Sequence, residues 1–123
     1  MLFRSNSLAL LGQYAEARAE FQRMPADNPF RLKGEALVAA RTGDAAGAER
    51  MMARIRQLAG ATYSYQYCQI YAQLGAVDRA FAELDNAIKA KDSGLIYLKR
   101  DAFLDPIRSD PRYAALLRRL KFP

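Results

Sequence analysis

The chain has 123 residues, a length that suits one domain, and 51% of its residues are hydrophobic, so we expect it to fold. It contains no histidine and a single cysteine, which removes the commonest general base and any internal disulfide. The net charge of +6 comes from 19 basic and 13 acidic residues that are spread along the chain, as on a solvated surface. Composition thus disfavours an enzyme, and we predict no catalytic residues, no cofactor and no metal.

Alanine occurs 23 times, whereas valine, isoleucine and threonine together occur nine times, so helices are favoured over a sheet. Apolar residues recur every three to four positions, which predicts three pairs of helices. In chain order the pairs span 2–11 with 13–24, 29–42 with 44–58, and 62–74 with 77–91. A loop at 92–94 then precedes short helices near 95–99 and 101–108 and a last helix over 111–120.

Polar residues at several of these boundaries can cap the helix that follows. Asn28 and Asp110 each precede a proline, which suits the first position of a helix. Asp44 and Thr62 are predicted to cap the helices that begin after them.

An internal repeat organises the first 91 residues. Gly12, Gly43 and Gly75 are separated by 31 and 32 residues, and each is followed at the same spacing by a small and then a large apolar residue. Glycine ends a helix in a left-handed conformation at little cost, and alanine lets two antiparallel helices approach closely. The alanines, five residues on, are Ala17, Ala48 and Ala80; the large residues, nine on, are Phe21, Met52 and Leu84.

These positions resemble the tetratricopeptide repeat (TPR) family, whose helix–turn–helix copies stack into a right-handed superhelix. The repeat is two or three residues shorter than the usual length of about 34, and Leu32 or Ser64 stands at the tryptophan position. The resemblance implies one all-α domain over 1–123, a right-handed α-solenoid with repeats at about 1–28, 29–60 and 61–92. Its motif positions are Ser5, Leu8, Gly12, Ala17, Phe21 and Pro29, then Ala36, Ala39, Gly43, Ala48 and Met52, then Cys68, Tyr71, Gly75, Ala80 and Leu84.

Residues 93–123 are similar to the helical segment that closes TPR arrays at the C-terminus of many multidomain bacterial proteins. The likeness implies that this segment caps one end of the stack and that Pro123 is a genuine C-terminus. A stack needs a cover at both ends, and no comparable cap precedes Met1, Leu2 and Phe3. We therefore expect the N-terminal helix to meet a second copy of the chain, as a homo-oligomer, or an upstream domain.

Several residues with chemical potential have simpler structural roles. Asp101, Asp105 and Asp110 are expected to serve turns and helix starts rather than a metal. Glu83 and Asp85 are two apart on a helix, so they point to different faces. Cys68, at a small-residue position, should be buried and unreactive.

A stripe of side chains opposite the repeat core is the candidate binding site. In the TPR family the equivalent stripe lines the concave groove, and here it would place two cations beside tyrosine and glutamine side chains. Such a groove suits a peptide with an acidic end; the alternative is a solvated face without a ligand. The stripe comprises Lys33, Leu37 and Arg41 in the second repeat and Tyr65, Gln69 and Gln73 in the third.

The expected function is a non-catalytic scaffold that binds a peptide or protein. The alternatives are a structural or oligomerisation module, which packs against itself or an upstream signalling or DNA-binding domain, and weak nucleic-acid binding by a basic surface. No recognition motif or phosphate-binding loop supports nucleic acid. No apolar run approaches the roughly 20 residues of a membrane span, and no signal peptide is recognised. A cytoplasmic location is expected, or a periplasmic one if the chain is part of a membrane-anchored protein.

Overall fold

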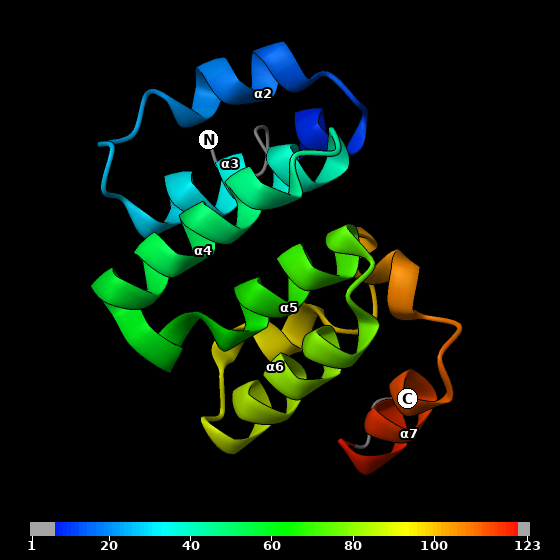
Figure 1. Cartoon of the computed structure of the whole chain (residues 1–123). Coiled ribbons are helices and arrows are strands. Elements are labelled where there is room, and N and C mark those ends of the chain that lie inside the picture. The colour runs from blue at the N-terminus through cyan, green and yellow to red at the C-terminus, as the bar shows by residue number, and fades with distance from the viewer. Residues whose placement is uncertain (1–6, 121–123) are drawn as a thin grey trace. The chain divides into compact units, whose positions relative to one another are not determined.

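A computed structural model describes residues 7–120 of the chain, and every regular element in that range is a helix. The predicted all-α class is therefore confirmed for this part of the protein (Figure 1). A helical turn at residues 7–10 precedes the labelled elements. These are α2 (Tyr14–Phe21), α3 (Pro29–Arg41), α4 (Ala45–Ala59), η1 (Gly60–Tyr63), α5 (Ser64–Leu74), α6 (Val77–Lys89), η2 (Ser93–Tyr97), η3 (Ala102–Ile107) and α7 (Pro111–Arg119), where η marks a 3₁₀ helix.

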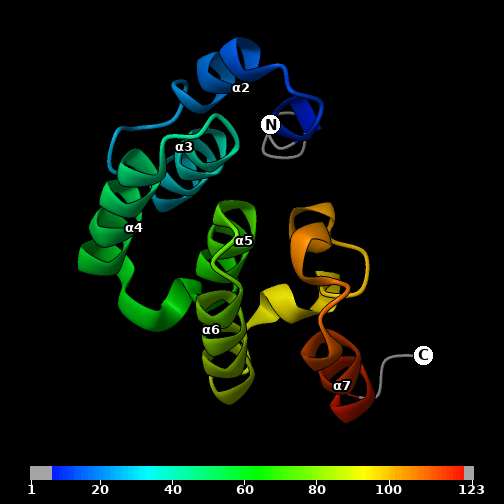
Figure 2. The same ribbon diagram turned by 45° about the vertical axis from the view of Figure 1, so that its right-hand side comes forward.

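The chain divides into two compact units, Met1–Tyr63 and Ser64–Pro123. Helices α2, α3 and α4 belong to the first, and α5, α6 and α7 belong to the second (Figure 2). In the first unit α3 packs along α4, and in the second α5 packs along α6. We predicted one domain; the division falls close to the expected start of the third repeat at residue 61.

One helix–glycine–helix turn occurs three times with nearly the same backbone geometry. Gly12, Gly43 and Gly75 have φ angles of 79°, 84° and 76°, in the left-handed region that glycine adopts without strain. The residue after each glycine has ψ between 68° and 73° and begins the next helix. Its N–H donates to a carbonyl five residues back, as in a Schellman motif. These bonds are Gln13 to Leu8 (2.9 Å), Asp44 to Ala39 (2.8 Å) and Ala76 to Tyr71 (2.9 Å).

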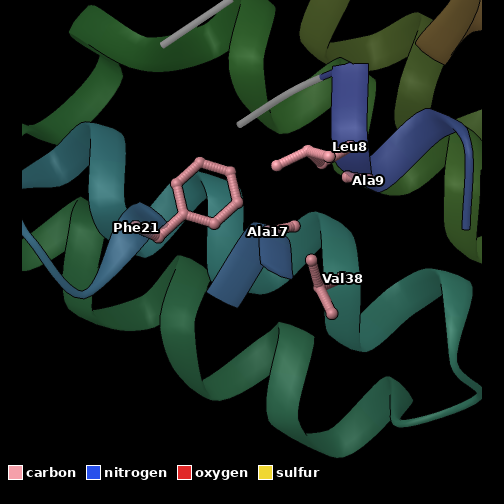
Figure 3. Close-up of a cluster of buried hydrophobic side chains, with 5 residues drawn as sticks. All are labelled: Leu8, Ala9, Ala17, Phe21 and Val38. Carbon is pink, nitrogen blue, oxygen red and sulfur yellow. The ribbon is translucent and has the colours of Figure 1, made fainter. Parts of the chain in front are cut away.

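The alanine and the large apolar residue that follow each turn are buried, as the repeat predicts. In the first unit, Ala17 and Phe21 of α2 form a cluster with Leu8, Ala9 and Val38 (Figure 3). Ala48 and Met52 take the same positions in α4, and Ala80 and Leu84 take them in α6. Because each alanine is fully buried, the paired helices can approach closely at these points.

The helix caps agree with the sequence at three of four predicted positions. Asn28 caps α3 by accepting from the N–H of Phe30 (2.9 Å). Oδ1 of Asp44 accepts from the N–H of Gly47 at the start of α4, and Oδ1 of Asp110 accepts from the N–H of Arg112 at the start of α7 (2.9 Å each). The prediction for Thr62 was wrong. Gly60, with φ 58°, ends α4, and the chain continues as η1, so Thr62 lies inside a 3₁₀ turn and α5 begins at Ser64.

The end of α6 repeats the Schellman geometry without a glycine. Lys91 takes φ 54°, and the N–H of Asp92 donates to the carbonyl of Ala87 at 2.9 Å. A lysine in this region costs roughly 1–2 kcal/mol relative to the right-handed conformation. Helix α6 therefore ends at Lys89, two residues before the predicted boundary.

Candidate functional site

The part of the predicted stripe that lies in the first unit is largely buried. On α3, Leu37 is fully buried and Lys33 is 6% exposed. The guanidinium Nη2 of Arg41 donates to the carbonyl oxygen of Leu10 at 3.2 Å, which ties α3 to the helical turn before Gly12. These three side chains thus contribute to the packing of the unit.

The part of the stripe that lies in the second unit binds the chain's own C-terminal segment. The hydroxyl of Tyr65 and the amide nitrogen of Gln69 both donate to Oδ2 of Asp101, each at 2.7 Å. The side-chain amide of Gln73 donates to the carbonyl of Phe103 at 2.8 Å. Tyr65 is only 2% exposed and Gln69 8%. A partner could reach this face of α5 only by displacing residues 101–103.

Asp101 is the central acceptor of this attachment. Its Oδ1 caps η3 by accepting from the N–H of Phe103 (2.9 Å), and its carbonyl accepts from Nη2 of Arg108 (2.7 Å). Arg108 also donates to the hydroxyl of Tyr113 (2.6 Å), which in turn donates to the carbonyl of Leu98 (2.7 Å). The predicted turn role of Asp101 is confirmed, but its two bonds to α5 were not predicted.

The single cysteine of the chain is inaccessible to solvent. Cys68 is fully buried in α5, as predicted. Burial, together with the negative charges of Asp101 and Glu83, raises the pKa of this thiol, so it stays protonated at neutral pH. Its position matches a packing role rather than that of a nucleophile.

The carboxylates singled out from the sequence do not converge on one point. Asp105 pairs with Arg108 (2.6 Å), and Asp110 caps α7. Glu83 is buried, whereas Asp85 on the same helix is exposed, so they occupy different faces as predicted. Within residues 7–120, no group of three or more acidic or cysteine side chains is arranged to hold a metal ion.

The buried hydroxyl of Tyr65 makes the free energy of unfolding depend on pH in the alkaline range. Burial and the neighbouring Asp101 raise the pKa of Tyr65, while an unfolded tyrosine ionises near pH 10. The folded state therefore keeps a proton that the unfolded state loses, and the free energy of unfolding falls as pH rises above about 10. We expect urea titrations of Tyr65→Phe to show a shallower decline there than wild type, by up to about 1.4 kcal/mol per pH unit. Equal slopes in both proteins would contradict this, and Tyr97→Phe, at a side chain that is 55% exposed, is the matched control.

An open groove lies between α6 and α7 in the second unit, and it was not predicted from the sequence. It encloses a volume of about 200 Å³. The α7 residues that line it are spaced i, i+3, i+4, i+7, so they form one face of a helix that can be recognised in the sequence. We call it the α6–α7 groove; its lining residues are Phe81, Asp85, Arg112, Ala115, Leu116 and Arg119.

Comparisons of the chain with protein-family models, with curated proteins and with solved structures find no match. In the described part of the chain, no helix combines the length and apolar character needed to cross a membrane. What the described residues define is an all-α protein built from helical hairpins.

Proposed function

We propose that the chain is a non-catalytic protein-interaction module, a right-handed solenoid of three TPR-like hairpins that binds a peptide or a protein surface. The observation that carries the proposal is the threefold turn at Gly12, Gly43 and Gly75, each with a fully buried alanine five residues later. Repeated hairpins of this kind build extended surfaces that suit binding.

The available side-chain chemistry supports binding over catalysis. The chain has no histidine to act as a general base near neutral pH. Its one thiol is buried with a raised pKa, and Asp101 and Asp110 are engaged as helix caps. A reactive nucleophile normally requires an adjacent base, which this arrangement does not supply.

The α5 part of the predicted stripe is not open to a partner, because it is bound by the chain's own C-terminal segment. On α5 the chain's own residues 101–103 occupy the place that an external peptide would take. An external partner at Tyr65, Gln69 and Gln73 would have to compete with this segment, so we expect the docking surface to lie elsewhere on the second unit. The alternative contact through Met1–Phe3 concerns residues outside those that the structure describes.

A peptide-display selection tests the proposed function. The immobilised full chain is offered a library of random 16-residue peptides, and an unrelated basic protein of similar size and charge serves as the control. We expect peptide families that bind this chain alone, with dissociation constants on the order of 1–100 μM, corresponding to about 5–8 kcal/mol. If no family is enriched over the basic control, the proposal is overturned.

A further inference from the structure

The α6–α7 groove has an apolar base. Phe81 of α6 and Leu116 of α7 are almost completely buried at its bottom, and Ala115 presents only a methyl group to the opening. Small-molecule pockets usually enclose about 300–1,000 Å³, whereas this groove holds about 200 Å³. That volume suits one apolar side chain of a partner better than a cofactor.

One end of the groove is closed by a clamp. The guanidinium of Arg112 lies over the ring of Phe81, 4.5 Å from its centroid. The same group pairs with Asp78 on α6 (3.0 Å) and with Asp110 (2.9 Å). Its hydrogen bonds lower the pKa of Asp110 to about 2, so this clamp stays charged at neutral pH. The charge of Arg112 is therefore satisfied within the chain.

The other end of the groove carries an arginine of α7, and an aspartate of α6 also lines the groove. Arg119 lines this end from the last turn of α7, and neither it nor the adjacent Arg118 forms an ion pair within residues 7–120. The last turn of α6 is also basic, with Lys89. Asp85 is the acidic lining residue on the α6 side, so a carboxylate entering the groove is directed towards the α7 side.

We infer that the α6–α7 groove docks an acidic helical segment of a partner protein. One apolar side chain of that segment lies over Phe81, Ala115 and Leu116, and a carboxylate one turn away pairs with Arg119. Helix-in-groove recognition uses such spaced anchors, and an arginine–carboxylate pair adds direction to the contact. The inference rests on the proposed interaction function and names its site and the chemistry of its partner.

The test measures how the selected 16-residue peptides bind to four variants of the full chain. Ala115→Glu places a charge over the apolar base, and Arg119→Glu reverses the charge at the open end. Ala114→Glu and Arg118→Glu are matched controls, because they make the same changes one residue away on exposed positions that do not line the groove. Fluorescence anisotropy gives the affinities, and circular dichroism verifies the helical content of each variant.

We expect the selected peptides to contain an apolar residue and a nearby aspartate or glutamate. The dissociation constant should rise about tenfold or more in the two groove variants, as for loss of a charge-assisted contact, and less than about threefold in the controls. If Ala115→Glu fails to fold, the comparison of Arg119→Glu with Arg118→Glu decides the matter alone.

Other outcomes would overturn the inference and can be told apart. Peptides that bind all four variants equally would leave the interaction function intact but place its site elsewhere, whereas a failed selection removes both proposals. A single-stranded DNA 20-mer that binds more tightly than the peptides and depends on Arg119 would make the groove a phosphate site. A dimer in light scattering that Ala115→Glu abolishes and Ala114→Glu preserves would make the occupant a second copy of the chain.

Discussion

Replacing Gly34 by alanine is expected to lower the free energy of unfolding by about 1–3 kcal/mol, although alanine is the better helix former. Gly34 lies inside α3, where a methyl group would overlap Cε1 and Cζ of the Phe21 ring. Phe21 is fully buried, so its ring cannot move into solvent to make room. The overlap therefore outweighs the gain of up to about 1 kcal/mol in helix propensity.

Urea unfolding of Gly34→Ala, Phe21→Leu and the double variant measures this effect. A leucine at residue 21 is smaller than the ring, so the double variant should be less destabilised than the sum of the two single changes. Ala53→Gly, at an exposed position of α4, supplies the helix-propensity cost on its own. An increase in stability on Gly34→Ala would show that the Phe21 ring adapts without cost and that the packing argument is mistaken.

The features that sequence predicted well depend on residues close together in the chain. The turn at each repeat glycine is set by that glycine, the residue after it and a carbonyl five residues back. The caps at Asn28, Asp44 and Asp110 likewise act within three residues. Thr62 shows the limit of such local signals, because a 3₁₀ turn and a helix start can use the same residues.

The orientation of the stripe could not be predicted, because it depends on residues distant in sequence. Helical spacing places Tyr65, Gln69 and Gln73 on one face of a helix but does not say what covers that face. The residues that cover it include Asp101, 36 residues beyond Tyr65. Without that contact, a tyrosine and two glutamines are equally consistent with an open groove and with a buried polar seam.

The α6–α7 groove and the role of Gly34 could not be predicted either, because both depend on contacts between different helices. The apolar and basic face of α7 is visible in the sequence, but this face forms a groove only because Phe81 of α6 lies opposite it. The need for glycine at residue 34 arises from Phe21, on a different helix. In both cases tertiary packing assigns a role to a residue that looks unremarkable in its local context.

Asp101→Ala is expected to reduce the free energy of unfolding by about 2–4 kcal/mol, because it leaves buried donors without an acceptor and removes a cap. The donors are the Tyr65 hydroxyl and the Gln69 amide, and the cap bond is that to the N–H of Phe103. Both donor side chains are more than nine-tenths buried, so solvent cannot readily replace the lost acceptor. Urea unfolding gives the change in stability, and hydrogen exchange of α5 should accelerate if the C-terminal segment detaches locally.

Asp105→Ala is the matched control for this change, because it removes a carboxylate four residues away in the same segment. Asp105 is exposed, and within residues 7–120 its ion pair is with Arg108, so its loss should cost no more than about 1 kcal/mol. Asp101→Asn keeps an acceptor oxygen but cannot serve all three donors, and it should fall between the two alanine variants. Equal effects of Asp101→Ala and Asp105→Ala would mean that apolar contacts of Phe103 and Leu104, rather than the Asp101 carboxylate, hold the C-terminal segment on α5.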